Sequence, residues 1–214
     1  ATAGALVFAN AAMFSTAQFA NFLWGIQFMV YVPFACLVWL AWLASGREGD
    51  ALAFAGAAIL CVVATYSYAN GMLLWPLSAV VLVAARGAGR RTLWHWAGWS
   101  AAGAASITFY FIGYRHPGNH PAFSVILHQP FAASQAFFAF IGSSLTLDAR
   151  FVRQFPLALL AGLVVCSSLI GLVAVAARRR RDPRALRPLV IWVSLAGYGL
   201  ASAAATVAGR LGFG

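Results

Sequence analysis

Residues 22–45 read "FLWGIQFMVYVPFACLVWLAWLAS", and this stretch decides the fold class because it contains no charged side chain. A helix needs about 20 predominantly apolar residues to span the hydrocarbon core of a bilayer. The rest of the chain has the same character: 63% of the 214 residues are hydrophobic, 8% are charged, and the mean hydropathy is +0.84. A soluble globular domain has about 25% charged residues. The composition therefore predicts an integral membrane protein.

Further apolar runs along the chain predict further helices. No stretch alternates apolar and polar residues as the strands of a membrane barrel do, so we expect an all-α fold. Five more runs are apolar enough to be spans: residues 51–68, 72–85, 92–114, 155–176 and 188–209. Together with residues 22–45 they predict a polytopic helical membrane protein with about six transmembrane helices in a single domain, residues 1–214. The chain opens without Met and ends without a polar tail, so we expect it to be part of a longer protein.

The arginines predict the orientation of these helices. All 14 basic residues are Arg, and 10 of them lie in three loops: one in residues 46–50, three in 86–91 and six in 178–187. The positive-inside rule places such loops in the cytoplasm. The use of Arg alone, with abundant Ala, indicates a GC-rich bacterial genome, so we expect a multi-pass protein of a bacterial inner membrane. The net charge of +10 reflects this topology and does not predict nucleic-acid binding.

The same argument predicts the placement of residues 131–146, which are apolar but short for a span. The loops 86–91 and 178–187 share a side only if an even number of crossings separates them. Residues 92–114 and 155–176 already supply two crossings. We therefore expect residues 131–146 to form a re-entrant or interfacial helix on the outer side.

The loop "GYRHPGNHP", residues 113–121, is the most polar outer stretch. His116 and His120 are four residues apart, a spacing that on a helix brings two imidazoles to one metal ion. Pro117 interrupts such a helix, so we predict no metal site and no cofactor. Two interpretations stay open: a stiff loop exposed to water, or a loop that binds an anionic head group through the guanidinium of Arg115.

Polar residues also lie at the outer ends of two other predicted helices. Asn21, Trp24 and Gln27 recur at intervals of three and share one helical face, which either contacts a neighbouring helix or lines a cavity. Trp24 also suits an interfacial aromatic belt. Asn70 and Gly71 form the tip of a predicted hairpin, where their types favour a left-handed turn, although the Asn70 amide also suits a sugar hydroxyl.

At the opposite end, Trp94, Trp96 and Trp99, with His95, are predicted to form an interfacial belt without chemistry. Arg210 ends the last span, where snorkelling of the side chain to the interface is the default expectation.

Four of these stretches together carry a resemblance. "FSTAQFANFLWGIQ" (14–27), "TYSYANGMLLWP" (65–76), "GYRHPGNHP" (113–121) and "GRLGFG" (209–214) resemble a group of poorly characterised polytopic bacterial membrane proteins. That group is similar to the GT-C class of glycosyltransferases, which use polyprenyl-phosphate-linked sugars. Members of the class carry an acidic residue in the first outer loop, and nothing in this sequence matches it, so no catalytic residue is assigned.

The resemblance implies a glycosyltransferase-like protein that acts on a polyprenyl-phosphate-linked sugar at the periplasmic face, among membrane lipids. It implies that Arg115, His116 and Arg210 face the phosphate. It also implies that Trp24, Gln27 and Asn70 face the acceptor or the sugar. The alternative is a non-catalytic accessory subunit that packs against other membrane subunits. A transporter ranks last, because no predicted span holds an ionisable residue at mid-depth.

Overall fold

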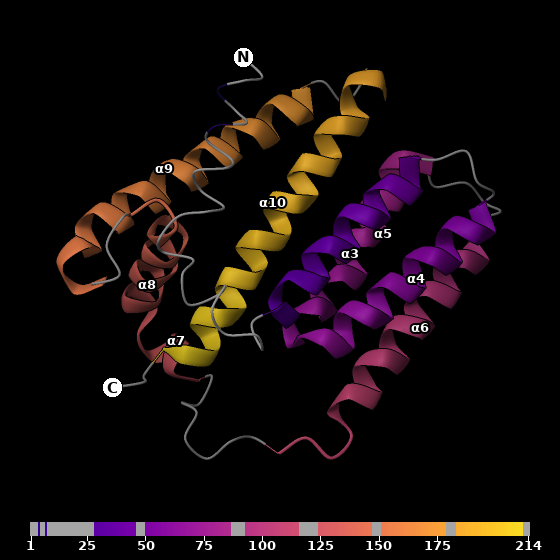
Figure 1. Cartoon of the computed structure of the whole chain (residues 1–214), viewed down its shortest axis with the longest axis horizontal. Coiled ribbons are helices and arrows are strands. Elements are labelled where there is room, and N and C mark those ends of the chain that lie inside the picture. Colours follow the sequence, from indigo (N-terminus) through magenta and orange to yellow (C-terminus); the bar gives the residue numbers. More distant parts are fainter. Residues whose placement is uncertain are drawn as a thin grey trace. The chain divides into compact units, whose positions relative to one another are not determined.

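The computed structural model describes Gly4 and Val7 and residues 28–45, 50–86, 93–115, 124–146, 151–178 and 183–211. Within these ranges all regular structure is helical (Figure 1), which confirms the all-α prediction. The elements are α3 (Phe28–Ser45), α4 (Asp50–Ser67), the short 3-10 helix η3 (Ala69–Leu73), α5 (Leu74–Arg86), α6 (Leu93–Phe111), α7 (Ser124–His128), α8 (Pro130–Ser143), α9 (Phe151–Arg178) and α10 (Pro183–Arg210).

Two of the described helices are long and apolar enough to cross a membrane. They contain the segments Phe155–Val175, with a hydropathy of 2.5, and Ile191–Arg210, with a hydropathy of 1.4. The helix α8 has 14 residues, fewer than the ~20 that a span requires. It coincides with the short apolar stretch that was expected to form the outer helix.

The chain divides into two compact units. Unit 1 consists of residues 1–28, 117–171 and 203–214, and unit 2 consists of residues 29–116 and 172–202. The helices α9 and α10 therefore contribute residues to both units.

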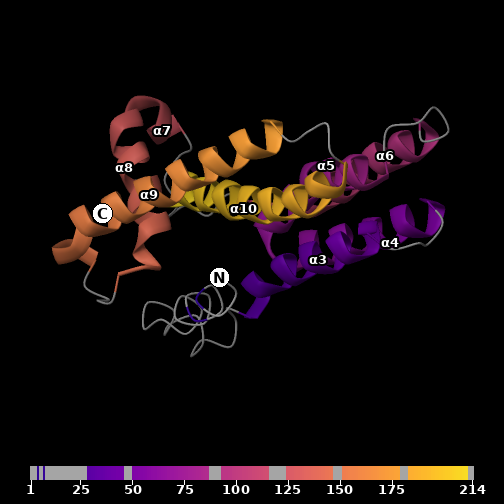
Figure 2. The same cartoon turned by 90° about the horizontal axis from the view of Figure 1, so that it is seen from above.

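Unit 2 is organised around Trp75, which is almost fully buried in a cluster of apolar side chains from α3, α4, α5, α6 and α10. Figure 2 shows α3 and α4 on one side of this unit and α5 and α6 on the other. The indole nitrogen of Trp75 donates a hydrogen bond of 3.1 Å to the hydroxyl of Thr65 on α4. The indole nitrogen of Trp99 on α6 donates in turn to the Trp75 carbonyl at 3.2 Å. A buried indole needs such a partner, so these two bonds fix how α4, α5 and α6 pack.

The predicted tryptophan belt is only partly correct. Trp94 is 84% exposed at the start of α6, as a side chain of an interfacial belt would be. Trp99 is 7% exposed, and its ring lies 5.0 Å from that of Trp75 at an angle of 61°. The belt prediction is therefore wrong for Trp99, which is a core residue.

The predicted left-handed turn at Asn70–Gly71 is also wrong. Gly113 is the one residue with a positive φ that the structure records in its described ranges, and residues 69–73 form η3 instead. Gly71 is needed for a different reason: a Cβ at this position would overlap the carbonyl group of Ala64. The absence of a side chain lets the connection pack directly on the last turns of α4.

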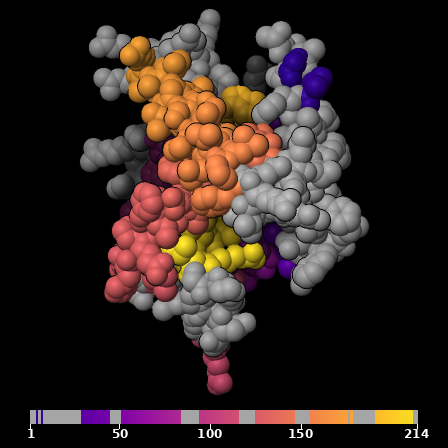
Figure 3. Space-filling model, turned by 90° about the vertical axis from the view of Figure 1, so that its left-hand side faces the viewer, coloured from indigo at the N-terminus to yellow at the C-terminus, as the bar shows by residue number. Residues whose placement is uncertain are grey.

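Unit 1 is built around the contact between α8 and α9. A Cβ added at Gly142 would overlap the Ala158 carbonyl, and a Cβ added at Gly162 would overlap the Phe138 carbonyl. On each helix a glycine thus lies against the backbone of the other helix. Small residues allow such close approach in membrane helix pairs. On the face shown in Figure 3, atoms of the α7–α8 segment (salmon) lie next to the C-terminal residues of α10 (yellow).

Candidate functional site

The side chain of Asn70 forms part of a polar contact inside unit 2. Its amide nitrogen donates to the hydroxyl of Ser202 on α10 at 2.7 Å and lies 3.4 Å from the Ser202 carbonyl oxygen. Ser202 also shares a hydrogen bond with the buried Tyr198. The amide predicted to meet a sugar hydroxyl therefore connects η3 to α10, a structural role that the prediction did not include.

Arg115 lies just beyond the end of α6. Gly113 adopts a φ of +75°, a conformation that glycine tolerates far better than other residues. The amide of Tyr114 donates to the carbonyl of Phe111 at 3.1 Å and closes the last turn. Tyr114 and Arg115 follow this break and are exposed. The guanidinium therefore belongs to a stretch of chain that has left the helix.

Next to Arg115 the structure reveals four aromatic residues in contact, the aromatic strip: Tyr66, Tyr110, Phe111 and Tyr114. Successive ring centroids lie 6.3 Å, 5.3 Å and 5.5 Å apart. The hydroxyl of Tyr66 donates to the Ser106 carbonyl at 3.2 Å, which holds that ring against α6. Tyr66, Phe111 and Tyr114 are 50–53% exposed. The strip is a series of half-exposed aromatic rings that ends at Tyr114, directly before Arg115 in the chain.

Arg210 is the last residue of α10 and is exposed. The amide of Leu211 donates to the Val207 carbonyl at 2.8 Å, so the helix closes its final turn around this position. Arg210 belongs to unit 1 and Arg115 to unit 2. The hypothesis that the two guanidinium groups converge on one head group therefore stays a prediction.

Three of the predicted site residues, Trp24, Gln27 and His116, lie outside the residues that the structure describes. Among those it does describe, no group of three or more His, Cys, Asp or Glu side chains is placed to hold a metal ion. The described part of the site contains a guanidinium, which can bind anions, and aromatic rings, which can contact apolar surfaces.

The aromatic strip was missed by the sequence reasoning, although one signal was present. Tyr110 and Tyr114 are four residues apart, the spacing that places side chains on one face of a helix. The contact between Tyr66 on α4 and Tyr110 on α6 could not be predicted from residue spacing, because it depends on how the two helices pack.

The chain was compared with protein families, curated proteins and solved structures. No family model matches the chain, and neither a curated protein nor a solved structure matches it.

Proposed function

We propose that the chain is a multi-pass protein of a bacterial inner membrane, with about six spans and α8 as an outer helix, which binds a polyprenyl-phosphate-linked sugar at its periplasmic face. The two long apolar helices support a membrane location. The three arginine-containing loops support the orientation, because all of them connect the same ends of the predicted spans. This function is that of a glycosyltransferase-like protein of the GT-C type, without an assigned catalytic residue.

The observation that carries the proposal is the position of Arg115 directly after the aromatic strip at the end of α6. A guanidinium forms two parallel hydrogen bonds to a phosphate. Aromatic rings with exposed faces offer a rigid surface for the apolar face of a sugar ring, and tyrosine hydroxyls add polar contacts at the edge. The proposed ligand joins a phosphate to a sugar. The guanidinium of Arg115 suits the phosphate, and the aromatic rings that precede it in the chain suit the sugar.

Replacement of the Arg115 guanidinium by an ammonium group of the same charge tests the proposal. Hydrogen bonds to a charged group contribute about 1.5–3 kcal/mol, or roughly 10- to 100-fold in affinity. We expect Arg115→Lys to weaken binding of a polyprenyl-phosphate-linked sugar to the purified protein by about that factor, because an ammonium lacks the planar fork. The affinity is measured from the fluorescence of a labelled lipid, to which the purified protein is added stepwise in detergent.

The matched control is Arg178→Lys, because Arg178 is an exposed residue at the end of α9, and we expect this substitution to leave the affinity unchanged. Equal binding by the unmutated protein and both variants would refute the role of Arg115. Equal affinity for phosphorylated and unphosphorylated lipid would refute the proposed function itself.

The second candidate function is that of an accessory subunit, and the exposed surface of α9 favours it. In the apolar segment Phe155–Val175 only 11% of the most apolar window is buried within the chain. Lipid covers such a surface under the first proposal and a partner helix under the second. Native mass spectrometry from nanodiscs separates them: a single chain supports the binding function, and a defined hetero-complex supports the subunit.

A further inference from the structure

Among the described residues of unit 2, four tryptophans are more than half exposed: Trp39 and Trp42 on α3, Trp94 on α6 and Trp192 on α10. Trp39 and Trp42 lie in the last two turns of α3, and their ring centroids are 5.6 Å apart. Trp94 is the second residue of α6. Trp192 is the second residue of the apolar segment Ile191–Arg210. Each of these rings therefore lies near a helix end or at the start of an apolar segment.

The helix ends concerned lie toward one end of unit 2. Figures 1 and 2 show that α3 and α5 end, and that α4, α6 and α10 begin, toward this same end. The part of α9 that belongs to unit 2 also ends here, at the exposed Arg178, three residues beyond the apolar segment Phe155–Val175. We call this part of the unit the inner end, since the arginines predict it to face the cytoplasm.

The segments of sequence that join the helices at the inner end differ in charge. Residues 86–91 contain three arginines, and residues 178–187 contain six arginines and one acidic residue. Residues 46–50, between α3 and α4, contain two acidic residues and one arginine. The positive charge of the inner end therefore belongs to the connections α5–α6 and α9–α10.

Both basic connections are followed by an exposed tryptophan. Arg91 precedes Trp94 by three positions, and Arg187 precedes Trp192 by five. Tryptophan side chains are enriched at the level of lipid head groups, and clusters of basic residues beside membrane spans attract anionic lipids. Together the two features therefore fit an anionic membrane surface.

The surface around the tryptophans favours lipid over a nucleic acid as the anion. On α3 the exposed side chains of Phe34 and Val38 continue the surface of Trp39 along the helix. A nucleic acid at the arginines would leave this apolar surface in water, whereas the acyl chains of a phospholipid cover it. A phospholipid thus matches both the charge and the apolar surface below it.

We propose that the inner end of unit 2 selects anionic phospholipids of the cytoplasmic leaflet, with the exposed tryptophans at the level of the head groups and the arginines of the two basic connections supplying the charge. A zwitterionic phospholipid also has a phosphate, but its ammonium group offsets the attraction. The inference rests on the membrane location and orientation in the proposed function, and it does not depend on the sugar-phosphate ligand or on Arg115.

Native mass spectrometry tests the preference. The purified protein is released from nanodiscs that contain equal amounts of phosphatidylglycerol and phosphatidylcholine with the same acyl chains. We expect the protein to retain mainly phosphatidylglycerol. Each arginine near an anionic surface contributes about fivefold, so Arg178→Gln and, separately, Arg91→Gln should lower the ratio of the two bound lipids by about that factor. Equal retention of both lipids by the unmutated protein overturns the proposal, and so does an unchanged ratio in both variants.

Two control variants make the reading specific. Arg178→Lys keeps the charge and should keep the ratio, because this attraction depends on charge and not on a planar fork. Arg210→Gln removes an exposed charge at the other end of α10 and should also keep the ratio. A loss in Arg210→Gln equal to that in Arg178→Gln overturns the placement at the inner end. Binding of a short RNA that is lost in Arg178→Gln, without any lipid preference, assigns the arginines to nucleic acid instead.

Tryptophan fluorescence locates the bound lipid. Vesicles of both lipids are prepared twice, once with brominated phosphatidylglycerol and once with brominated phosphatidylcholine, because bromine quenches indole on contact. We expect stronger quenching by the brominated phosphatidylglycerol, from the exposed rings and not from the buried Trp75 and Trp99. The double variant Trp94→Phe/Trp192→Phe should reduce this difference. Equal quenching in the two preparations overturns the proposal.

Failure of this proposal can be distinguished from failure of the proposed function. If the protein retains no lipid of either kind, the membrane location is wrong, and the proposed function falls with it. If both lipids are retained equally while Arg115→Lys still weakens binding of the sugar-linked lipid, only the preference of the inner end is lost.

Discussion

The two units achieve close helix packing in opposite ways. In unit 2, large aromatic side chains fill the space between helices, and Trp75 and Trp99 use their indole nitrogens to join α4, α5 and α6. In unit 1, α8 and α9 meet through glycines that face the backbone of the partner helix. The contacts of Trp75 and Trp99 depend on side-chain volume, and the contact between α8 and α9 depends on its absence.

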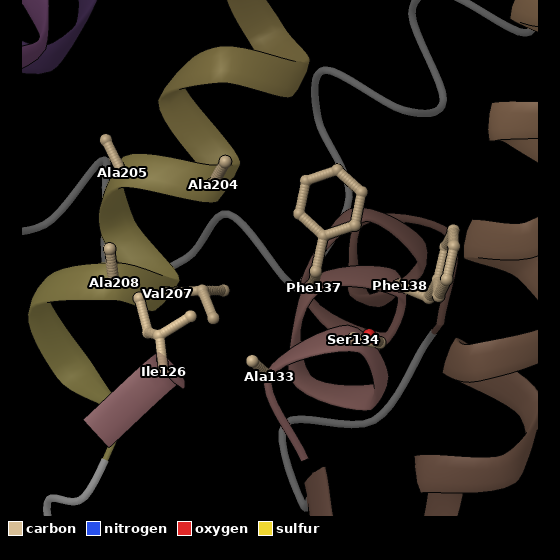
Figure 4. Close-up of a pocket in the computed structure, with 9 residues that line it drawn as sticks. All are labelled: Ile126, Ala133, Ser134, Phe137, Phe138, Ala204, Ala205, Val207 and Ala208. Carbon is tan, nitrogen blue, oxygen red and sulfur yellow. The ribbon is translucent and has the colours of Figure 1, made fainter. Parts of the chain in front are cut away.

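Unit 1 also contains an apolar pocket of about 600 Å³ that is lined by residues of α7, α8 and α10 (Figure 4). The buried cluster of unit 2 combines the aromatic rings of Phe54, Trp75, Trp99 and Tyr198 with aliphatic side chains and cysteines. In unit 1 the glycine contacts hold α8 on α9, and Ala133, Ser134, Phe137 and Phe138 of α8 line the pocket together with residues of α10. Unit 2 thus carries the half-exposed aromatic strip that precedes Arg115, and unit 1 contains the apolar pocket.

The largest expected effect comes from removing the central side chain of unit 2. Trp75→Ala deletes the ring contact with Trp99 and the hydrogen bond to Thr65. Truncation of a buried Trp costs about 3–5 kcal/mol in the free energy of unfolding. Thermal unfolding in detergent should show a large fall in Tm. The control Trp39→Ala removes a tryptophan that is 58% exposed, and we expect a change of no more than about 0.5 kcal/mol. Equal effects of the two substitutions would contradict the central position of Trp75.

A smaller but still clear effect is expected from adding volume in unit 1. Gly162→Leu places a side chain against the backbone of α8 at Phe138. Such overpacking costs about 1–3 kcal/mol and separates the two helices. Limited proteolysis should then cut the α8 region faster than in the unmutated protein. Gly171→Leu, on the same helix where a Cβ meets open space, is the matched control. If both variants resist the protease equally, the glycine contact does not hold α8 in place.

The helices could be predicted because their signal is local. Residues 51–68 and 92–114 were expected from apolar composition alone, and α4 and α6 occupy Asp50–Ser67 and Leu93–Phe111. Residues 155–176 likewise lie within α9. Composition determines whether a segment is apolar, and length determines whether it suits a membrane. Both quantities are properties of one segment and need no partner.

The contacts of the site could not be predicted, because each joins segments far apart in the sequence. Asn70 was expected to form a left-handed turn, but its amide reaches Ser202 across 132 positions. Trp99 was expected at the interface, and its burial depends on the ring of Trp75. The importance of Gly71 depends on the position of a carbonyl in α4. Residue types indicate what a side chain can do, and packing decides which partner it meets.

The central claim is that the recognition surfaces of both units face the periplasm, and cysteine labelling in intact cells tests it most directly. In a variant without Cys36, Cys61 and Cys166, single cysteines at Ala69 in unit 2 and at Asn119 or Ala149 in unit 1 are treated with a membrane-impermeant thiol reagent. Our account predicts that all three react from outside, while a cysteine at Ala88 in the predicted inner loop reacts only after the cells are opened. Protection of Ala149 while Asn119 reacts would contradict the outer position of α8. Protection of all three with reaction at Ala88 would contradict the periplasmic site.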